Sequence, residues 1–193
     1  PQPWGHFDLS LVLRPGMQLT DGAYLSRSFM GYGGHIGLSF KPGWFHPKDT
    51  FNMNVTAGDG IGRYLNSSNN FAIATSFVAN TTSPATAAAV RAATTTEYGF
   101  EVGYQHWWRD NLRSNVSFGL NHHDVPASII GAARAAATNK QLETIHVNVI
   151  WNPVSFVDVG LEYMWGNRKV VAVAAGPSDA TEQALISKVA VRF

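Results

Sequence analysis

Residues 185–193 read Leu-Ile-Ser-Lys-Val-Ala-Val-Arg-Phe and alternate between two kinds of side chain. Successive residues of a β-strand point to opposite faces, so Val189, Val191 and Phe193 share one face and Lys188 and Arg192 share the other. An apolar face backed by a polar one is typical of a strand with lipid outside and a wet lumen inside. The aromatic last residue, Phe193, resembles the terminal assembly signal of outer-membrane barrels.

The same two-residue alternation recurs along the chain. It predicts eight strands, most of them near the ~9–11 residues that cross a tilted path through a bilayer. The predicted strands span residues 6–13, 28–40, 51–58, 97–107, 113–122, 144–151, 156–165 and 185–193. The fold class is therefore all-β, and we expect residues 1–193 to form an antiparallel transmembrane β-barrel of about eight strands.

The amino-acid composition excludes several other classes of protein and of functional site. The mean hydropathy of −0.07 is too low for a helical membrane protein, and no run approaches the ~18 apolar residues of a spanning helix. The chain has no cysteine, which excludes a disulfide scaffold, a thiol nucleophile and a cysteine-ligated metal. A net charge of +1 gives no electrostatic reason to expect nucleic acid as a partner. We expect no cofactor, no metal and no enzymatic activity.

The predicted connections alternate between short and long, as periplasmic turns and external loops do in outer-membrane barrels. Short turns are expected at 41–50, 108–112 and 152–155, and long connections at 15–27, 59–96, 123–143 and 166–184. Residues 81–96 are rich in Ala and Thr and are expected to contain a short helix. Aromatic residues near the strand ends predict a girdle at the membrane interface. They are Trp4, Trp44, Phe45, Trp107, Trp108, Trp151 and Trp165.

Charged residues on the predicted inward face are the candidate pore-lining residues, because charges inside a barrel tune which ions pass. The candidate solute contacts are Arg14, Lys41, Arg63, Glu101, Arg113, Glu162, Lys188 and Arg192. Arg63 lies just past a strand end and is the preferred single contact. On this face Arg14, Lys41, Arg113, Lys188 and Arg192 outnumber Asp8, Glu101, Asp158 and Glu162 by five to four, a slight basic excess. The alternative is that these residues form ordinary ion pairs in the wall, such as one between Glu162 and Lys188.

Histidines at two places in the sequence are candidates for chemistry. His122 and His123 are adjacent on a strand, so their side chains point to opposite faces and cannot easily chelate one metal ion. His146 with nearby serines suggests a hydrolase such as a barrel phospholipase, but that chemistry needs an outward-facing base at the membrane rim. His146 is predicted to face inward, which argues against it.

Several motifs resemble the DcaP-like family of outer-membrane porins. They are residues 58–64 (Gly-Asp-Gly-Ile-Gly-Arg-Tyr), residues 104–108 with 112–115 after a turn, and residues 147–154 leading into 159–166. The resemblance implies homotrimers of sixteen-stranded pores in the outer-membrane lipid of Gram-negative bacteria, admitting small, preferentially anionic solutes. It also implies that this chain corresponds to the C-terminal half of such a barrel.

Two other interpretations remain open at this point. A closed eight-stranded barrel with a structural or adhesive surface role is possible, because eight strands suffice to close a barrel whose interior is filled by side chains. A soluble β-sandwich is disfavoured, since its strands would leave many aromatic residues on one continuous face.

Overall fold

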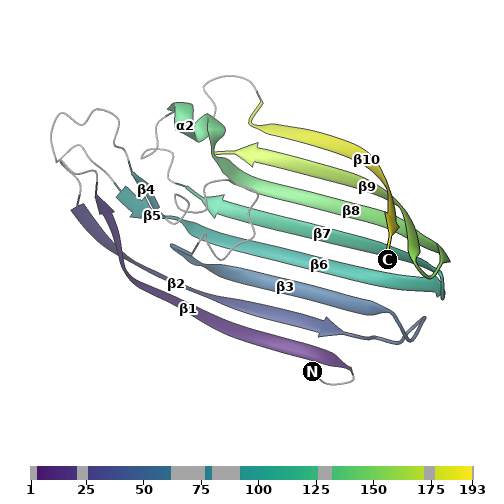
Figure 1. Ribbon diagram of the computed structural model, residues 1–193. Helices are drawn as coiled ribbons and strands as arrows, with labels where there is room; N and C mark the ends of the chain where they lie inside the picture. The colour runs from purple at the N-terminus through teal and green to yellow at the C-terminus, as the bar shows by residue number, and fades with distance from the viewer. Residues whose placement is uncertain are drawn as a thin grey trace.

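The computed structural model describes residues 4–20, 26–61, 77–79, 92–125, 132–171 and 177–192. Its main feature is one antiparallel sheet of eight strands, each paired with the next main-sheet strand along the chain (Figure 1). The strands are β1 (Gly5–Thr20), β2 (Ser26–Phe40), β3 (Thr50–Asp59), β6 (Thr96–Arg109), β7 (Leu112–Asp124), β8 (Asn139–Val154), β9 (Val157–Val170) and β10 (Asp179–Val191). A separate pair joins β4 (Phe77–Ala79) to β5 (Ala92–Thr94), and the helix α2 (Ala132–Ala137) precedes β8.

All eight predicted strands are present, and their register follows the predicted alternation. Between β9 and β10, Val159 pairs with Val189 and Val157 with Val191. On the opposite face, Asp158 forms an ion pair with Arg192. Paired residues of neighbouring strands lie on the same side of a sheet, so this pattern separates an apolar face from a polar one across the hairpin.

The apolar face is exposed. Leu11 is 82% exposed, Val189 67% and Leu9 66%, and many other large apolar side chains from β1 to β10 are exposed with them. Among the described residues, the buried hydrophobic ones are Ile61, Val125 and Ala135 alone. A soluble domain places such residues in a core, so this distribution contradicts a soluble β-sandwich and fits a wall in contact with lipid.

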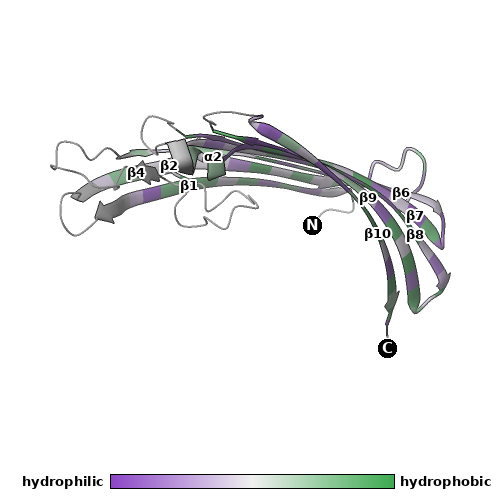
Figure 2. Ribbon diagram, turned by 90° about the horizontal axis from the view of Figure 1, so that it is seen from above, coloured by the Kyte–Doolittle hydropathy of each residue, from purple (hydrophilic) through white to green (hydrophobic). Residues whose placement is uncertain are grey.

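The sheet is arched and open (Figure 2). β1 and β10 are its two edges, and they are not paired with each other. The structure therefore shows a curved wall rather than the closed eight-stranded barrel. In the part of the chain that the structure describes, no helix has the length and apolar character to span a membrane.

The connections 41–49, 110–111 and 155–156 join strands at one end of the sheet, here called the short-turn end, and the connections that follow β1, β3, β7 and β9 leave from the other end (Figure 1). Trp4, Trp44, Phe45, Trp108 and Trp151 belong to the short-turn end, and all are about half exposed or more. These five of the seven predicted girdle residues therefore lie at one end of the sheet, whereas Trp165 lies within β9, which continues to Val170. Trp107 differs, because it pairs with Arg113 on the polar face.

Four local expectations were wrong, among them the long connection predicted at 166–184, of which residues 166–170 belong to β9 and residues 179–184 to β10. The connection predicted at 15–27 is largely strand, since β1 and β2 stay paired to Thr20 and Ser26. Pro15, which has no N–H to donate, sits at a register shift between Arg14 and Met17. Asn152 and Pro153 belong to β8, and the turn falls at Ser155 and Phe156.

The helix expected within 81–96 is wrong for its last residues, because 92–94 form β5 and β6 begins at Thr96. Residues 81–91 lie outside the described part. The observed helix, α2, is an Ala-rich segment in the connection predicted at 123–143. Alanine has the highest intrinsic helix propensity, so the composition signal was present in both segments.

Candidate pore-lining site

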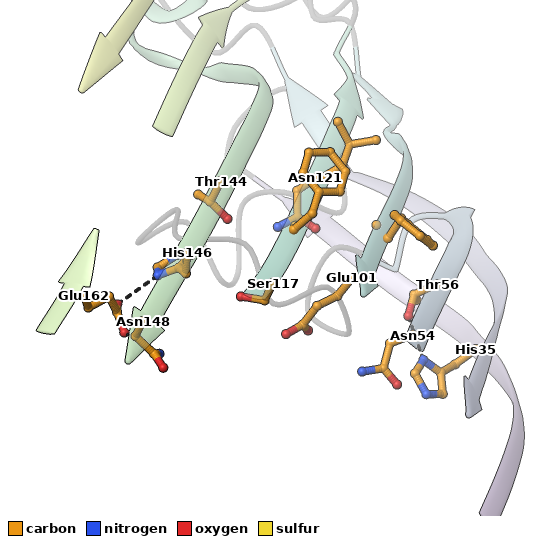
Figure 3. Close-up of a pocket in the computed structure, with 15 residues that line it drawn as sticks. His35, Asn54, Thr56, Glu101, Ser117, Asn121, Thr144, His146, Asn148 and Glu162 are labelled. Atoms are coloured by element: carbon orange, nitrogen blue, oxygen red, sulfur yellow. Dashed lines mark hydrogen bonds and ion pairs between the residues drawn. The ribbon is translucent and has the colours of Figure 1, made fainter. Parts of the chain in front are cut away.

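A hollow of about 570 Å³ occupies the polar face of the sheet (Figure 3). It is lined from six neighbouring strands, β2, β3, β6, β7, β8 and β9. A single hollow shared by that many strands requires this face to be the concave one. Its labelled polar side chains are His35, Asn54, Thr56, Glu101, Ser117, Asn121, Thr144, His146, Asn148 and Glu162.

A row of hydrogen-bonded side chains crosses the concave face nearer the short-turn end. The Gln105 Nε2 donates to Asn115 Oδ1 at 2.8 Å, and Asn115 Nδ2 donates to Asn148 Oδ1 at 2.7 Å. Asn148 Nδ2 in turn donates to Glu162 Oε2 at 3.1 Å. The three amides all donate in the same direction and end on a carboxylate, an arrangement in which neighbouring hydrogen bonds strengthen one another. We call Gln105, Asn115, Asn148 and Glu162 the amide row.

The amide row exists because the strand register places one polar residue per strand at the same height. Gln105 pairs with Asn115, Asn115 with Asn148, and Asn148 with Glu162. Each carboxamide has two N–H donors and an oxygen with two lone pairs, so the row retains capacity to hydrogen-bond a solute. The arrangement suits polar, hydroxylated molecules in water.

The histidines of the hollow are held by neighbours on adjacent strands. His35 Nδ1 lies 2.8 Å from Thr56 Oγ1, and His146 Nδ1 lies 3.1 Å from Glu162 Oε1. Glu162 is thus hydrogen-bonded to both His146 and Asn148. In the pairing of β9 with β10, Glu162 lies opposite Ile186. The expected Glu162–Lys188 contact is therefore wrong, because the register sets Lys188 opposite Gly160 instead.

Of the predicted solute contacts, Glu101 and Glu162 line the hollow. The basic candidates in the described part lie elsewhere. Arg14 Nη1 donates to the carbonyl of Gly60 at 3.0 Å, and Arg192 is ion-paired with Asp158. Lys188 is exposed on the edge strand, and Lys41 is exposed in the turn after β2. Arg63 and Phe193 lie outside the described residues.

Arg113 is the basic candidate with the most contacts at the short-turn end. Its Nη1 donates to Asn152 Oδ1 at 2.7 Å, and its Cζ lies 5.3 Å from the ring centroid of Trp107. Lys48 Nζ lies 5.1 Å from the same ring. Two cations near one indole are attracted to its π-face, which fixes both side chains at this end of the wall.

A buried polar cluster lies at the other end, where the long connections begin. Thr95 Oγ1 donates to Glu97 Oε1 at 2.7 Å, and His123 Nδ1 lies 3.4 Å from the same oxygen. Ile61 is fully buried and lies close to Gly33 and Gly58. A Cβ atom added to either glycine would lie 2.7 Å from the Cδ1 atom of Ile61. His122 points to the opposite face, stacked on Tyr98 with ring centroids 4.8 Å apart. The two adjacent histidines therefore face opposite sides, as predicted.

Asp49 ties the turn between β2 and β3 to the end of β6. Its side chain is fully buried and accepts hydrogen bonds from Tyr104 Oη (2.7 Å), the His106 ring (2.9 Å) and the Trp107 backbone N–H (2.9 Å). Burial raises the pKa of this carboxyl, but these hydrogen bonds, the Trp107 N–H first, outweigh it and lower the pKa from 3.8 to about 2. The carboxylate stays ionised and acts as a structural clamp.

The described side chains offer no cluster of three or more His, Asp or Glu residues suited to a metal ion. His146 lines the hollow and is bound to a carboxylate, as the inward prediction required. Thr56, Ser117, Asn121 and Thr144 also line the hollow but were not singled out from the sequence. Their strand parity, shared with Asn54, Glu101 and His146, was the signal that would have found them.

Comparison with known proteins agrees with this architecture. Residues 61–180, more than half of the chain, match the family model described as DcaP outer membrane protein. The crystal structure of the outer membrane channel DcaP of Acinetobacter baumannii is similar, with a TM-score of 0.54 and 17% sequence identity. The likeness covers 86% of this chain and 41% of that channel, and at this identity it establishes the fold. A search of curated protein sequences gave no match. The chain belongs to the DcaP outer membrane protein family and is localised to the bacterial outer membrane.

Proposed function

We propose that this chain forms part of the wall of a passive diffusion channel for small hydrophilic solutes. The observation that carries the proposal is the hollow of about 570 Å³ on a concave face lined by hydrogen-bonding side chains, behind an apolar face turned outward. A wall with this polarity separates lipid from an aqueous lumen. Passage then needs no nucleotide and no covalent step.

The complete protein is proposed to be a larger barrel, of which this chain is the C-terminal part. Both edges of the eight-stranded sheet are unpaired in the described part, and the matched channel is spanned to only 41% of its length. Unpaired strand edges are not tolerated in hydrocarbon, so each edge needs a further strand. A homotrimer of sixteen-stranded barrels, as the family resemblance implies, is the assembly we propose.

Expression of residues 1–193 alone distinguishes the larger barrel from a closed barrel of eight strands. If further strands are required, the isolated segment should not give the compact, heat-modifiable species that folded barrels show on electrophoresis. The longer chain should give it. A stable, heat-modifiable barrel from residues 1–193 alone would favour the structural or adhesive role instead.

The solutes are proposed to be small and weakly biased toward anions. The bias rests on Arg14, Lys41, Arg113, Lys188 and Arg192, with Arg63 beyond a strand end. The described basic residues lie away from the hollow, and Arg192 is neutralised by Asp158, so the bias is expected to be small. Charges in wet surroundings interact at about 1 kcal/mol at 4 Å, and salt screens the rest.

Reversal potentials of the reconstituted complete protein in planar bilayers test the proposal. We expect steady ionic conductance, a modest anion preference at low salt, and its decline as salt rises. A clear cation preference at low salt would overturn the anion bias. Arg63→Ala is expected to reduce the preference, and an unchanged value would remove Arg63 from the site.

A further inference from the structure

On the described part of the concave face, Glu101 stands apart from other charged side chains. On β6 its neighbours on the same face are Gly99 and Gly103. Across the sheet it pairs with Asn54 on β3 and with Gly119 on β7. Three of the four closest positions thus lack a side chain, and the fourth carries a neutral amide.

The carboxylate of Glu101 is also without a partner among the residues that the structure describes. In the described part of the chain it makes no hydrogen bond and no ion pair, and the residue is exposed. Glu162, the other carboxylate of the hollow, is bound by His146 and Asn148. Neither lysine nor arginine lines the hollow among the described residues. The charge of Glu101 is therefore directed at whatever enters the hollow.

Hydroxyl groups line the same hollow as this carboxylate. Thr144 on β8 pairs with Gly119 on β7. The Thr144 Oγ1 lies 3.1 Å from the position that a Cβ atom added to Gly119 would occupy, so the hydroxyl group lies next to that glycine. Ser117 lies on the same face of β7, two residues before Gly119, and lines the hollow with it. A protonated amine has three N–H donors, and one carboxylate with neighbouring hydroxyl oxygens can accept all of them.

We propose that Glu101 is a contact point for solutes that carry a positively charged nitrogen. The inference rests on the proposed channel function, and it refines the solute class of the same site. A single carboxylate in a wet passage binds weakly, which suits a channel that must also release its solute. Glu101 also opposes the anion bias of the described basic residues, which lie away from the hollow.

The test uses the complete protein in planar bilayers with 1,4-diaminobutane as the probe and 1,4-butanediol as its uncharged counterpart. We expect the diamine to reduce the ionic current at millimolar concentration and the diol to leave it unchanged. In Glu101→Gln, the diamine concentration for half-block should rise at least several-fold, and the reversal potential should shift toward anion preference.

Glu143→Gln is the matched control. Glu143 lies on the opposite face from Thr144, where its carboxylate accepts a hydrogen bond from Gln141, so the same loss of charge should leave the block unchanged. Equal block of the wild type and Glu101→Gln would overturn the inference, and so would an equal loss of block in Glu143→Gln.

Loss of ionic conductance altogether would refute the channel proposal rather than this one. Calorimetric titration of the diamine into the protein in detergent then decides the carboxylate site. Heat of binding that disappears in Glu101→Gln and persists in Glu143→Gln would support the site. Absence of binding to the wild type would overturn it.

Discussion

Asp49 is one residue whose chemistry determines how two distant segments meet. It lies outside the strands, yet its carboxylate gathers Tyr104, His106 and Trp107 from the end of β6. Asp110 is a useful contrast, because it is exposed and pairs with Lys48, whose hydrogen bond lowers the pKa of that carboxyl. The two aspartates lie at the same end of the sheet, but only Asp49 is buried.

Asp49→Asn should therefore lower the free energy of unfolding by about 1–3 kcal/mol, because a neutral amide cannot accept all three hydrogen bonds as well. Urea unfolding of the folded protein in detergent, followed by tryptophan fluorescence, measures the change. Asp110→Asn is the control and should have little effect, since exposed ion pairs contribute little. Equal destabilisation by both substitutions would show that burial of Asp49 is not the cause.

The pH dependence of stability follows from the pKa of Asp49. That pKa is about 2 in the folded protein and near 3.8 when unperturbed. The ionised carboxylate thus contributes its full stabilisation above about pH 4 and loses it as the pH falls toward 2. Acid titration of unfolding should show this loss in the wild type and a smaller one in Asp49→Asn. Parallel acid profiles for the two proteins would contradict the assignment.

At the scale of elements, glycines set how closely strands and connections approach. A Cβ on Gly58 would lie 2.3 Å from the carbonyl oxygen of Tyr32, 2.6 Å from Gly33 Cα and 2.7 Å from Ile61 Cδ1. β2, β3 and the start of the following connection meet at this point. On Gly103 the nearest atom to an added Cβ is 3.7 Å away, an ordinary contact.

Gly58→Ala should separate β2 from β3 locally and reduce the free energy of unfolding by about 1–3 kcal/mol, as overpacked sites do. Gly103→Ala, on the same face of the sheet, should change stability far less. Thermal unfolding in detergent with both variants measures the difference. If Gly58→Ala were as stable as Gly103→Ala, the close approach at Ile61 would not constrain the fold.

At the scale of the whole molecule, the distribution of polarity is the reverse of a soluble domain. Leu11, Leu9 and Val189 are exposed, whereas the buried polar and charged residues of the described part include Asp49, Glu97 and His123. Such a wall is stable only where lipid covers the apolar face. Its assembly therefore depends on delivery to the membrane as well as on the contacts within the sheet.

Deletion of Phe193 should impair assembly into the outer membrane more than it impairs the stability of the folded protein. One apolar side chain contributes about 1.5–3 kcal/mol by burial, too little to account for failure to assemble. Surface labelling of cells gives the assembled amount, and urea unfolding of the purified variant gives the stability. Normal surface levels of the truncated protein would contradict a role in assembly.

Much of the fold could be predicted from local pattern. Side-chain alternation located all eight strands, because the period of two is a property of the strand itself and needs no knowledge of its partners. The same parity placed Glu101, His146 and Glu162 on one face and separated His122 from His123. Pro15 and the 152–155 turn were misplaced, because bulges depend on how two strands pair.

What only the tertiary structure decided was which residues meet across strands. Gln105 and Asn115 lie on one hairpin, Asn148 and Glu162 lie on another, and the strand register joins the four into the amide row. The same register binds Glu162 to His146 instead of Lys188 and leaves Glu101 among glycines. Alternation specifies the face of each residue, but its height along the sheet follows from turns, bulges and hydrogen-bonded pairing, which are non-local.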